Sequence, residues 1–204
     1  MMQNNVIGVL ASGRGSNLQA IIEAINKGLL NVEIGVVISD KPNAKALDIA
    51  TENNIIAICV DRKECSNQQD FEEKIVVALK KHNVSLVVLA GFMRILSPYF
   101  IQEFKEKIIN IHPSLLPSFP GKNAHEQVIA YGAKVSGCTI HFVDEGMDSG
   151  PIILQESIPV LDNDTEDSLA KRILYLEHTL YPKAISLVME NKLKIIGRKV
   201  IIKE

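Results

Sequence analysis

Short apolar runs alternate with segments whose apolar residues recur at helical spacing through the first half of the chain. Val6–Leu10 is such a run, and the apolar positions between 18 and 25 follow it at helical spacing, with Gly28 marking the stop. The predicted strands here are 6–10, 34–39, 55–60 and 86–90, and the predicted helices are about 16–28, 44–53 and 71–82. Alternation of this kind predicts a parallel sheet with right-handed crossovers.

The second half follows a different pattern. The predicted strands are 108–111, 136–143 and 152–160, and the tail over 193–202 is a weak hairpin. A long helix begins at about Glu166, after a plausible cap at Asp164 or Thr165, and Pro182 ends, kinks or restarts it. We expect one α/β domain over 1–204, with a Rossmann-like, mostly parallel sheet in residues 1–107 that continues into a mixed half over 108–204.

Composition narrows the class of protein. Apolar residues make up 47% of the 204 residues and charged residues 23%, which is the balance of a folded globular chain. The net charge of −2 argues against a nucleic-acid partner, and no apolar run approaches the roughly 20 residues that span a bilayer. The three cysteines are an odd number without metal-ligand spacing, which indicates a reducing compartment, and we expect a cytoplasmic location.

A glycine-containing loop, Ser12 to Asn17, follows the first predicted strand directly. Glycines let the backbone approach a ligand, and the helix that begins near Ser16 offers unpaired amides that favour an anion. The loop lacks the third glycine of a dinucleotide fingerprint and the lysine of a P-loop. A tight turn with Ser16 or Asn17 as helix cap explains the residues equally well, but the loop's position favours phosphate binding.

The segment from Ala90 to Pro98 follows another buried strand and contains one arginine, Arg94. Such a segment could line a flat aromatic ligand while Arg94 meets a carboxylate. Taken alone, the residues are better explained as part of the hydrophobic core with one arginine at the surface than as a ligand site.

Two further loops carry candidate catalytic groups. If the strand from 108 continues through His112, Asn110 and His112 share one face, and the prolines that follow hold them still. A carboxylate from the acidic loop 144–151 brought near His112 would raise the pKa of that imidazole and keep it charged. An imidazolium beside an amide suits the oxyanion formed by attack on an acyl carbon. No serine or cysteine lies in a convincing nucleophile setting, which favours direct transfer between two substrates.

Together these motifs resemble the phosphoribosylglycinamide formyltransferase family of folate-dependent enzymes. The matching segments run through nearly the whole chain in the family's order: 7–19, 89–97, 110–117, 119–121, 141–153 and 177–182. The Asn-x-His-Pro-Ser-Leu-Leu-Pro and Asp-Ser-Gly-Pro motifs are common to folate-dependent formyltransferases, whereas Ser-Gly-x-Gly-Ser-Asn is narrower.

The resemblance implies transfer of the formyl group of 10-formyltetrahydrofolate to the amine of glycinamide ribonucleotide, in purine synthesis, without a metal. It implies a catalytic trio of Asn110, His112 and Asp148, in which charged His112 stabilises the oxyanion and Asp148 handles the proton. It places the substrate phosphate on Gly15, Ser16 and Asn17, and the glycinamide end on Glu177. The implied folate-binding residues are Met93, Arg94, Ile95, Leu96, Asn110, Val143 and Asp144. The implied partners are these two substrates, with no nucleic acid or membrane, in a monomer or homodimer.

The sequence departs from the family at a few positions. Gln68 stands where many members have a basic residue for the folate tail, which predicts weaker polyglutamate contact there, and Lys122 and Asn123 alter another loop. The nearest alternatives are formyltetrahydrofolate hydrolase, which normally has an additional amino-terminal domain, and methionyl-tRNA formyltransferase, which has an additional carboxyl-terminal one. A non-catalytic nucleotide-binding module would leave Asn110, His112 and Asp148 without a role.

Overall fold

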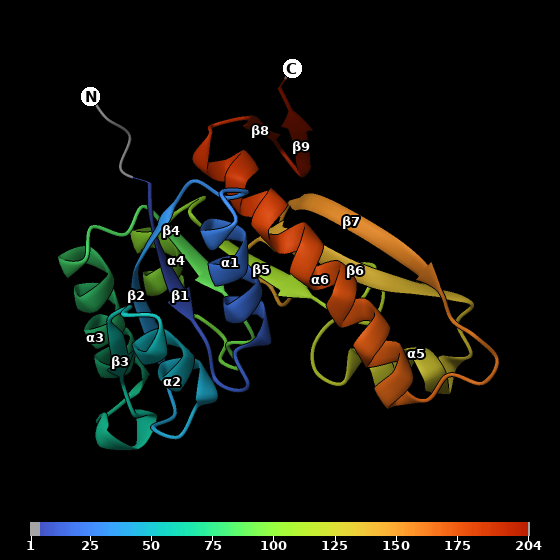
Figure 1. Cartoon of the computed structure of the whole chain (residues 1–204), viewed down its shortest axis with the longest axis horizontal. Coiled ribbons are helices and arrows are strands. Elements are labelled where there is room, and N and C mark those ends of the chain that lie inside the picture. The colour runs from blue at the N-terminus through green and yellow to red at the C-terminus, as the bar shows by residue number, and fades with distance from the viewer. Residues whose placement is uncertain (1–4, 204) are drawn as a thin grey trace. The chain divides into compact units, whose positions relative to one another are not determined.

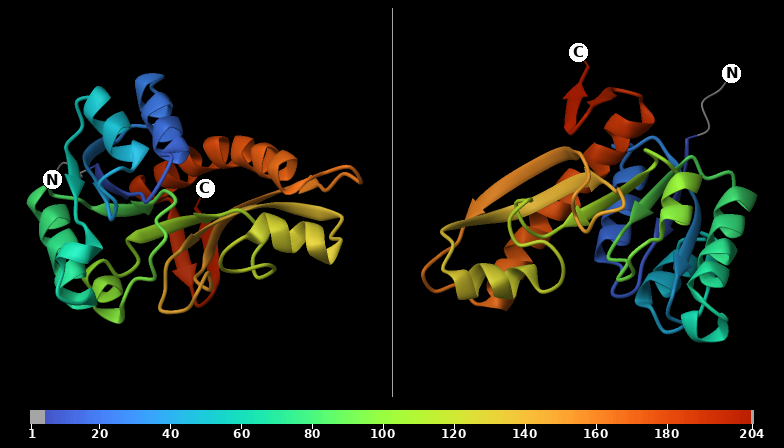
Figure 2. Two further views of the ribbon diagram at one scale, coloured as in Figure 1. Left: turned by 90° about the horizontal axis from the view of Figure 1, so that it is seen from below. Right: turned by 180° about the vertical axis from the view of Figure 1, so that it is seen from behind.

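The computed structural model describes residues 5–203, which form two compact units. Unit 1 ends at Ile109 and unit 2 begins at Asn110, so the strand β5 (Ile108–His112) starts in one and ends in the other. The chain has the predicted α/β fold with a mostly parallel sheet. Figures 1 and 2 show the elements.

Unit 1 is a parallel sheet covered by helices on both faces. Its strands are β1 (Val6–Leu10), β2 (Glu33–Ser39), β3 (Ala57–Cys59) and β4 (Leu86–Leu89), in the order β3-β2-β1-β4. Its helices are α1 (Ser16–Asn26), α2 (Lys45–Glu52), α3 (Gln68–Lys81) and α4 (Pro98–Glu103), with a 3₁₀ turn, η1 (Arg62–Glu64). The helices α1 and α2 lie side by side on one face, and α3 and α4 lie on the other (Figure 2).

The strand β4 is buried at every position, as its uninterrupted apolar run requires when both faces of a sheet are covered. Because β1, β2, β3 and β4 are parallel, the loops that follow them leave the same edge of the sheet. Ligands of open α/β sheets bind at this carboxyl edge. In unit 1 it carries the glycine-containing loop and the Arg94 segment.

Unit 2 pairs two antiparallel strands with a long helix. The strands are β6 (Val135–Phe142) and β7 (Ile152–Pro159), and α6 (Glu166–Met189) packs on both of them and on α5 (Ala124–Tyr131). Thr165 caps α6 in a capping box with Ser168. The predicted tail hairpin forms as β8 (Leu193–Ile196) and β9 (Lys199–Ile202).

The structure settles how Pro182 affects the long helix and adds two helices that the sequence pattern did not predict. The helix α6 continues through Pro182, because the residues around it, including the fully buried Tyr181, hold the segment in the core. The helix α5 was not predicted, although Gly132 in the left-handed conformation ends it. The short helix α4 was also not predicted, although Ser97 caps it and Pro98 begins it.

Replacement by alanine should affect stability differently at two adjacent residues of β6, Ser136 and Gly137. An added Cβ at Gly137 would lie 1.9 Å from the Glu156 carbonyl oxygen of β7, so Gly137→Ala must push the two strands apart. We expect it to lower the free energy of unfolding by about 1–3 kcal/mol, as overpacking does. Urea denaturation followed by circular dichroism measures this.

The matched control is Ser136→Ala in the same strand. The Ser136 hydroxyl is buried and has no hydrogen-bond partner among residues 5–203, so removing it should leave stability unchanged or raise it. Equal losses of stability in the two variants would contradict the packing explanation.

Candidate active site

The strand β5 presents two polar side chains at its carboxyl end. Alternation along the strand puts Asn110 and His112 on one face, as expected, because β5 includes His112. His112 is buried and Asn110 is half-buried. A buried polar side chain needs partners, and both residues have them.

The imidazole of His112 lies between two acceptors. Its Nδ1 is 3.4 Å from Oδ2 of Asp148, and its Nε2 is 2.9 Å from the backbone carbonyl oxygen of Phe119. Since each ring nitrogen faces an oxygen that can only accept, a charged imidazolium can donate to both at once. The site therefore gives both nitrogens of His112 an acceptor, one of them on Asp148.

Asp148 is held in place by the backbone around it. Its side chain is 14% exposed, and Oδ2 also accepts a 2.7 Å hydrogen bond from the Gly121 amide. Asp148 itself has φ 49°, and Phe119 has φ 54°. Left-handed backbone at non-glycine residues is uncommon and clusters at functional sites. The loop over 119–121 thus contacts both members of the His112–Asp148 pair.

His141, in β6, is the residue of this site that the motif analysis did not single out. Its Nε2 lies 3.3 Å from the Asn110 amide nitrogen, and its Nδ1 lies 2.8 Å from the Phe142 carbonyl oxygen. Burial lowers the pKa of His141, and this outweighs the opposing effects of the Phe142 carbonyl and of the Asp148 carboxylate, whose Oδ1 is 3.7 Å away. A neutral ring that donates from Nδ1 must accept at Nε2, so His141 orients the Asn110 amide.

The proline-rich loop after β5 is fixed by buried side chains. The hydroxyl of Thr139 donates to the Ser114 carbonyl at 2.6 Å and accepts from the Leu116 amide at 3.1 Å. Gln155 donates to the Leu116 carbonyl at 2.8 Å. These bonds join the loop to β6 and β7, so the segment behind His112 is rigid.

In unit 1 the glycine-containing loop ends at Gly15, the N-cap of α1. Gly15 has φ 74°, and an added Cβ would lie 3.0 Å from the Ala46 Cα, so both its conformation and its packing require glycine. No side chain caps the helix, and its first turn has no acidic residue. The explanation of Ser16 or Asn17 as the cap is therefore wrong. The amino end of an 11-residue helix that lacks a side-chain cap suits an anion.

The segment after β4 is exposed at Met93, Arg94 and Ile95, and its other large apolar residues are buried. Met93 is 62% exposed and Ile95 is 70% exposed, whereas Leu96 is buried. The guanidinium Nε of Arg94 donates to Oδ2 of Asp40 at 2.7 Å, and this pairing was not expected. Exposed apolar side chains next to an arginine can line a ligand that combines a flat ring with carboxylates.

The remaining predicted site residues lie in unit 2. Val143 and Asp144 follow β6, and Oδ1 of Asp144 accepts from the Ser149 hydroxyl at 2.6 Å, which folds the loop over 144–149. Glu177 is buried on α6. Burial, followed by the charge of Glu177, raises the pKa of Cys138 to about 12, so this carboxylate lies near β6.

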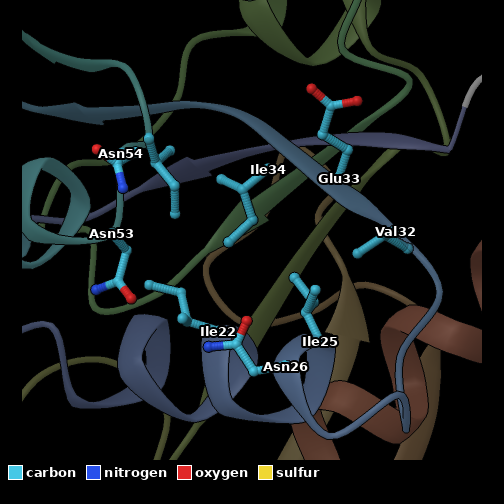
Figure 3. Close-up of a pocket in the computed structure, with 9 residues that line it drawn as sticks. Ile22, Ile25, Asn26, Val32, Glu33, Ile34, Asn53 and Asn54 are labelled. Carbon is cyan, nitrogen blue, oxygen red and sulfur yellow. The ribbon is translucent and has the colours of Figure 1, made fainter.

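Unit 1 also contains a cavity of about 320 Å³, and none of the predicted site residues lines it (Figure 3). Ile22 and Ile25 of α1 point into it toward Ile34 of β2. Glu33, the first residue of β2, also lines it, so the cavity is at the amino edge of the sheet. Within residues 5–203, no three His, Cys, Asp or Glu side chains form a group that could hold a metal ion, and no helix has the length and apolar character to cross a membrane.

The sequence matches the family model described as formyl transferase over residues 5–185. The phosphoribosylglycinamide formyltransferase of Bacillus subtilis (strain 168) is 42% identical over 177 residues, which are 87% of this chain and 91% of that protein. A solved structure, glycinamide ribonucleotide transformylase 1 from Symbiobacterium toebii, superposes with a TM-score of 0.97 at 43% identity, covering 100% of this chain and 96% of that one.

Other relatives are much longer than this chain. The trifunctional purine biosynthetic protein adenosine-3 of Drosophila melanogaster is 42% identical over 187 residues, which are 91% of this chain but 14% of that protein. The match to the family model and the identity to a relative of similar length agree, and the chain therefore belongs to the formyl transferase family.

Proposed function

We propose that this chain transfers the formyl group of 10-formyltetrahydrofolate to the amine of glycinamide ribonucleotide, giving formylglycinamide ribonucleotide and tetrahydrofolate in purine synthesis. The observation that carries the proposal is the buried His112–Asp148 pair on the same strand face as Asn110. The relatives of similar length are named phosphoribosylglycinamide formyltransferase and glycinamide ribonucleotide transformylase, which supports it. We expect the protein to act in the cytoplasm.

The proposed binding residues follow the geometry of each unit. Gly15, Ser16 and Asn17, at the amino end of α1, hold the phosphate of the ribonucleotide. The exposed apolar side chains of Met93 and Ile95 suit the aromatic part of the folate, with Arg94 at its glutamate end. The other proposed contacts are Leu96, Asn110, Val143 and Asp144 for the folate, and Glu177 for the glycinamide end.

His112 and Asn110 supply the electrostatic part of the mechanism. As the amine nitrogen attacks the formyl carbon, a carbon–nitrogen bond forms and the carbonyl electron pair moves onto oxygen. His112 donates to that oxygen from Nε2, which means that the oxygen takes the place of the Phe119 carbonyl. The Asn110 amide, with one hydrogen held by neutral His141, has its second hydrogen for the same oxygen.

Asp148 completes the proton transfer. When the bond between the formyl carbon and the folate nitrogen breaks, the amine has lost a proton and the folate nitrogen gains one. Asp148, next to His112, is the base within reach that can take the proton from the amine and pass it to the folate nitrogen.

Two of the three cysteines, Cys59 and Cys138, are unsuited to forming a covalent enzyme intermediate. Burial raises the pKa of Cys138 to about 12, and burial with nearby carboxylates raises the pKa of Cys59. Neither thiol is ionised near neutral pH, so neither is an activated nucleophile. Holding two substrates in contact supplies the rate advantage instead.

Purified protein with 10-formyltetrahydrofolate and glycinamide ribonucleotide should show formyl transfer, followed by the absorbance change of the folate. Formate release that needs no amine would instead identify a hydrolase. Transfer only to charged initiator tRNA would identify a methionyl-tRNA formyltransferase. Absence of all three activities would leave a non-catalytic nucleotide-binding module.

His112→Ala should lower kcat by about 10²–10³-fold, because it removes a charged donor to the oxyanion. The KM for the folate should change little, since that donor matters most in the transition state. Steady-state kinetics measures both. The control is His82→Ala at the end of α3, which should keep full activity. Survival of turnover in His112→Ala would refute the assigned role.

The lowered pKa of His141 predicts how stability depends on pH. Its pKa in the folded protein is below the ordinary 6.5, so below pH 6.5 the unfolded chain binds a proton more readily than the native state does. His141 therefore leaves the free energy of unfolding at its full value above pH 6.5 and lowers it as pH falls below 6.5. We therefore expect urea midpoints to fall from pH 7.5 to pH 5.5 less steeply in His141→Gln than in the wild type.

His125, whose pKa burial also lowers, contributes in the same direction in both proteins, so the difference between them isolates His141. Identical pH profiles in the two proteins would show that His141 is not held neutral.

A further inference from the structure

The tail hairpin of unit 2 has an arginine in its turn. Where β8 and β9 meet, Ile196 pairs with Lys199, which leaves Gly197 and Arg198 as a two-residue turn. Gly197 has φ 60°, as a two-residue hairpin turn with glycine at its first position requires. The turn therefore places Arg198 at the end of a short, regular hairpin.

The Arg198 side chain joins this hairpin to the acidic loop over 144–151. Its Nη2 donates to the backbone carbonyl oxygen of Ser149 at 2.6 Å, across 49 residues of sequence. Arg198 has no ion-pair partner within residues 5–203, so no carboxylate competes for its guanidinium. A hydrogen bond from a charged donor is roughly twice as strong as one between neutral groups.

The charges of the two segments are complementary. The loop over 144–151 contains the acidic residues Asp144, Glu145 and Asp148 and no basic residue. Residues 191–203 contain five cationic residues and no acidic one. The cationic residues are Lys192, Lys194, Arg198, Lys199 and Lys203. Opposite charges favour the approach of the hairpin to the loop, and the Arg198 hydrogen bond sets the point of contact.

The point of contact directly follows the proposed base, Asp148. Asp148 has φ 49°, and its Oδ2 lies 3.4 Å from Nδ1 of His112. Because a peptide group is planar, a bond to the Ser149 carbonyl restricts the orientation of the peptide between Ser149 and Gly150. An added Cβ at Gly150 would lie 1.8 Å from the Phe142 carbonyl oxygen, so close packing restricts the same peptide from its other end.

The loop also contains two hydrogen bonds of its own. The Ser149 hydroxyl and the Gly146 amide both donate to Oδ1 of Asp144, at 2.6 and 3.1 Å. These bonds close the loop on itself, whereas the bond from Arg198 ties it to another element of unit 2. Segments with few such ties open locally at little cost, so the tie from Arg198 limits the opening of this loop.

We propose that Arg198 is a positioning residue that acts through Ser149 to hold Asp148 against His112. The inference rests on the proposed function, in which Asp148 takes the proton from the amine. A base works only within hydrogen-bond reach of the proton that it removes, so a loop held in place raises the rate. The hairpin over 193–202 lies after residues 5–185, which the formyl transferase model matches.

The first test measures the loop and needs no substrate. Glu145 is exposed, so a glutamate-specific protease can cleave after it when the loop opens. We expect Arg198→Ala to be cleaved there about fivefold faster than the wild type under native conditions, since one exposed hydrogen bond contributes modestly. Arg198→Lys should be cleaved at an intermediate rate, because lysine keeps the charge and a donor.

The matched control is Lys199→Ala. It removes the same charge from the next position of the hairpin, which is exposed and has no ion-pair partner within residues 5–203. We expect this variant to match the wild type both in cleavage after Glu145 and in turnover.

The second test measures formyl transfer. Arg198→Ala should lower kcat about fivefold and leave the KM for both substrates unchanged, because only the position of the base is altered. In the Asp148→Asn background, where the base is already lost, Arg198→Ala should have no further effect. A purely structural role of Arg198 would lower kcat by the same factor in both backgrounds.

Equal cleavage of Arg198→Ala and the wild type would overturn the inference, and so would an unchanged kcat. The same loss of kcat with and without the Asp148 carboxylate would also overturn it. If the wild type shows no formyl transfer, the proposed function fails, while the cleavage rates still decide whether Arg198 holds the loop.

Discussion

The contact between His112 and Asp148 is the constraint on which the candidate site depends. Both side chains are largely removed from water, at 6% and 14% exposure, so each would be costly to bury without the other. The pair is supported by the Phe119 carbonyl, which contacts His112, and by the Gly121 amide, which donates to Asp148. Neutral His141 contacts the neighbouring Asn110 amide. The left-handed backbone at Asp148 is maintained by the same contacts.

Much of the fold could be predicted from the sequence, because strands with two covered faces produce unbroken apolar runs. The run at β4 and the helical spacing in α3 are examples, and their bounds differ from the expected ones by a few residues. The strand β3 is shorter than the apolar run around it, because only its central residues pair in register with β2, the sole neighbour of this edge strand. The helix α5 was missed although Asn123 is a residue type favoured at the N-cap and Glu126 follows three residues later. In the structure the Asn123 side chain donates to Glu126 and caps no backbone amide.

The candidate site was predictable to the extent that its residues lie close in sequence. Asn110 and His112 are two residues apart on one strand, and a period of two puts them together. The location of Asp148 came from resemblance and not from any local pattern. His141 lies in a strand that is otherwise nearly all buried, so it resembled a core histidine. Asp40 and Arg94 are 54 residues apart in the sequence, and no pattern in either segment predicts that they pair.

If the proposed formyl transfer takes place at His112, the Phe119 carbonyl at its Nε2 weakens the binding of the formyl group before it reacts. An incoming formyl oxygen must displace this carbonyl, and two neutral carbonyls are acceptors of similar strength, so the exchange yields almost no net affinity. Once negative charge develops on the formyl oxygen, it becomes a far better acceptor than the backbone group that it replaced. The exchange therefore stabilises the oxyanion and not the bound substrate. Such a contact increases kcat without tightening the binding of the substrate.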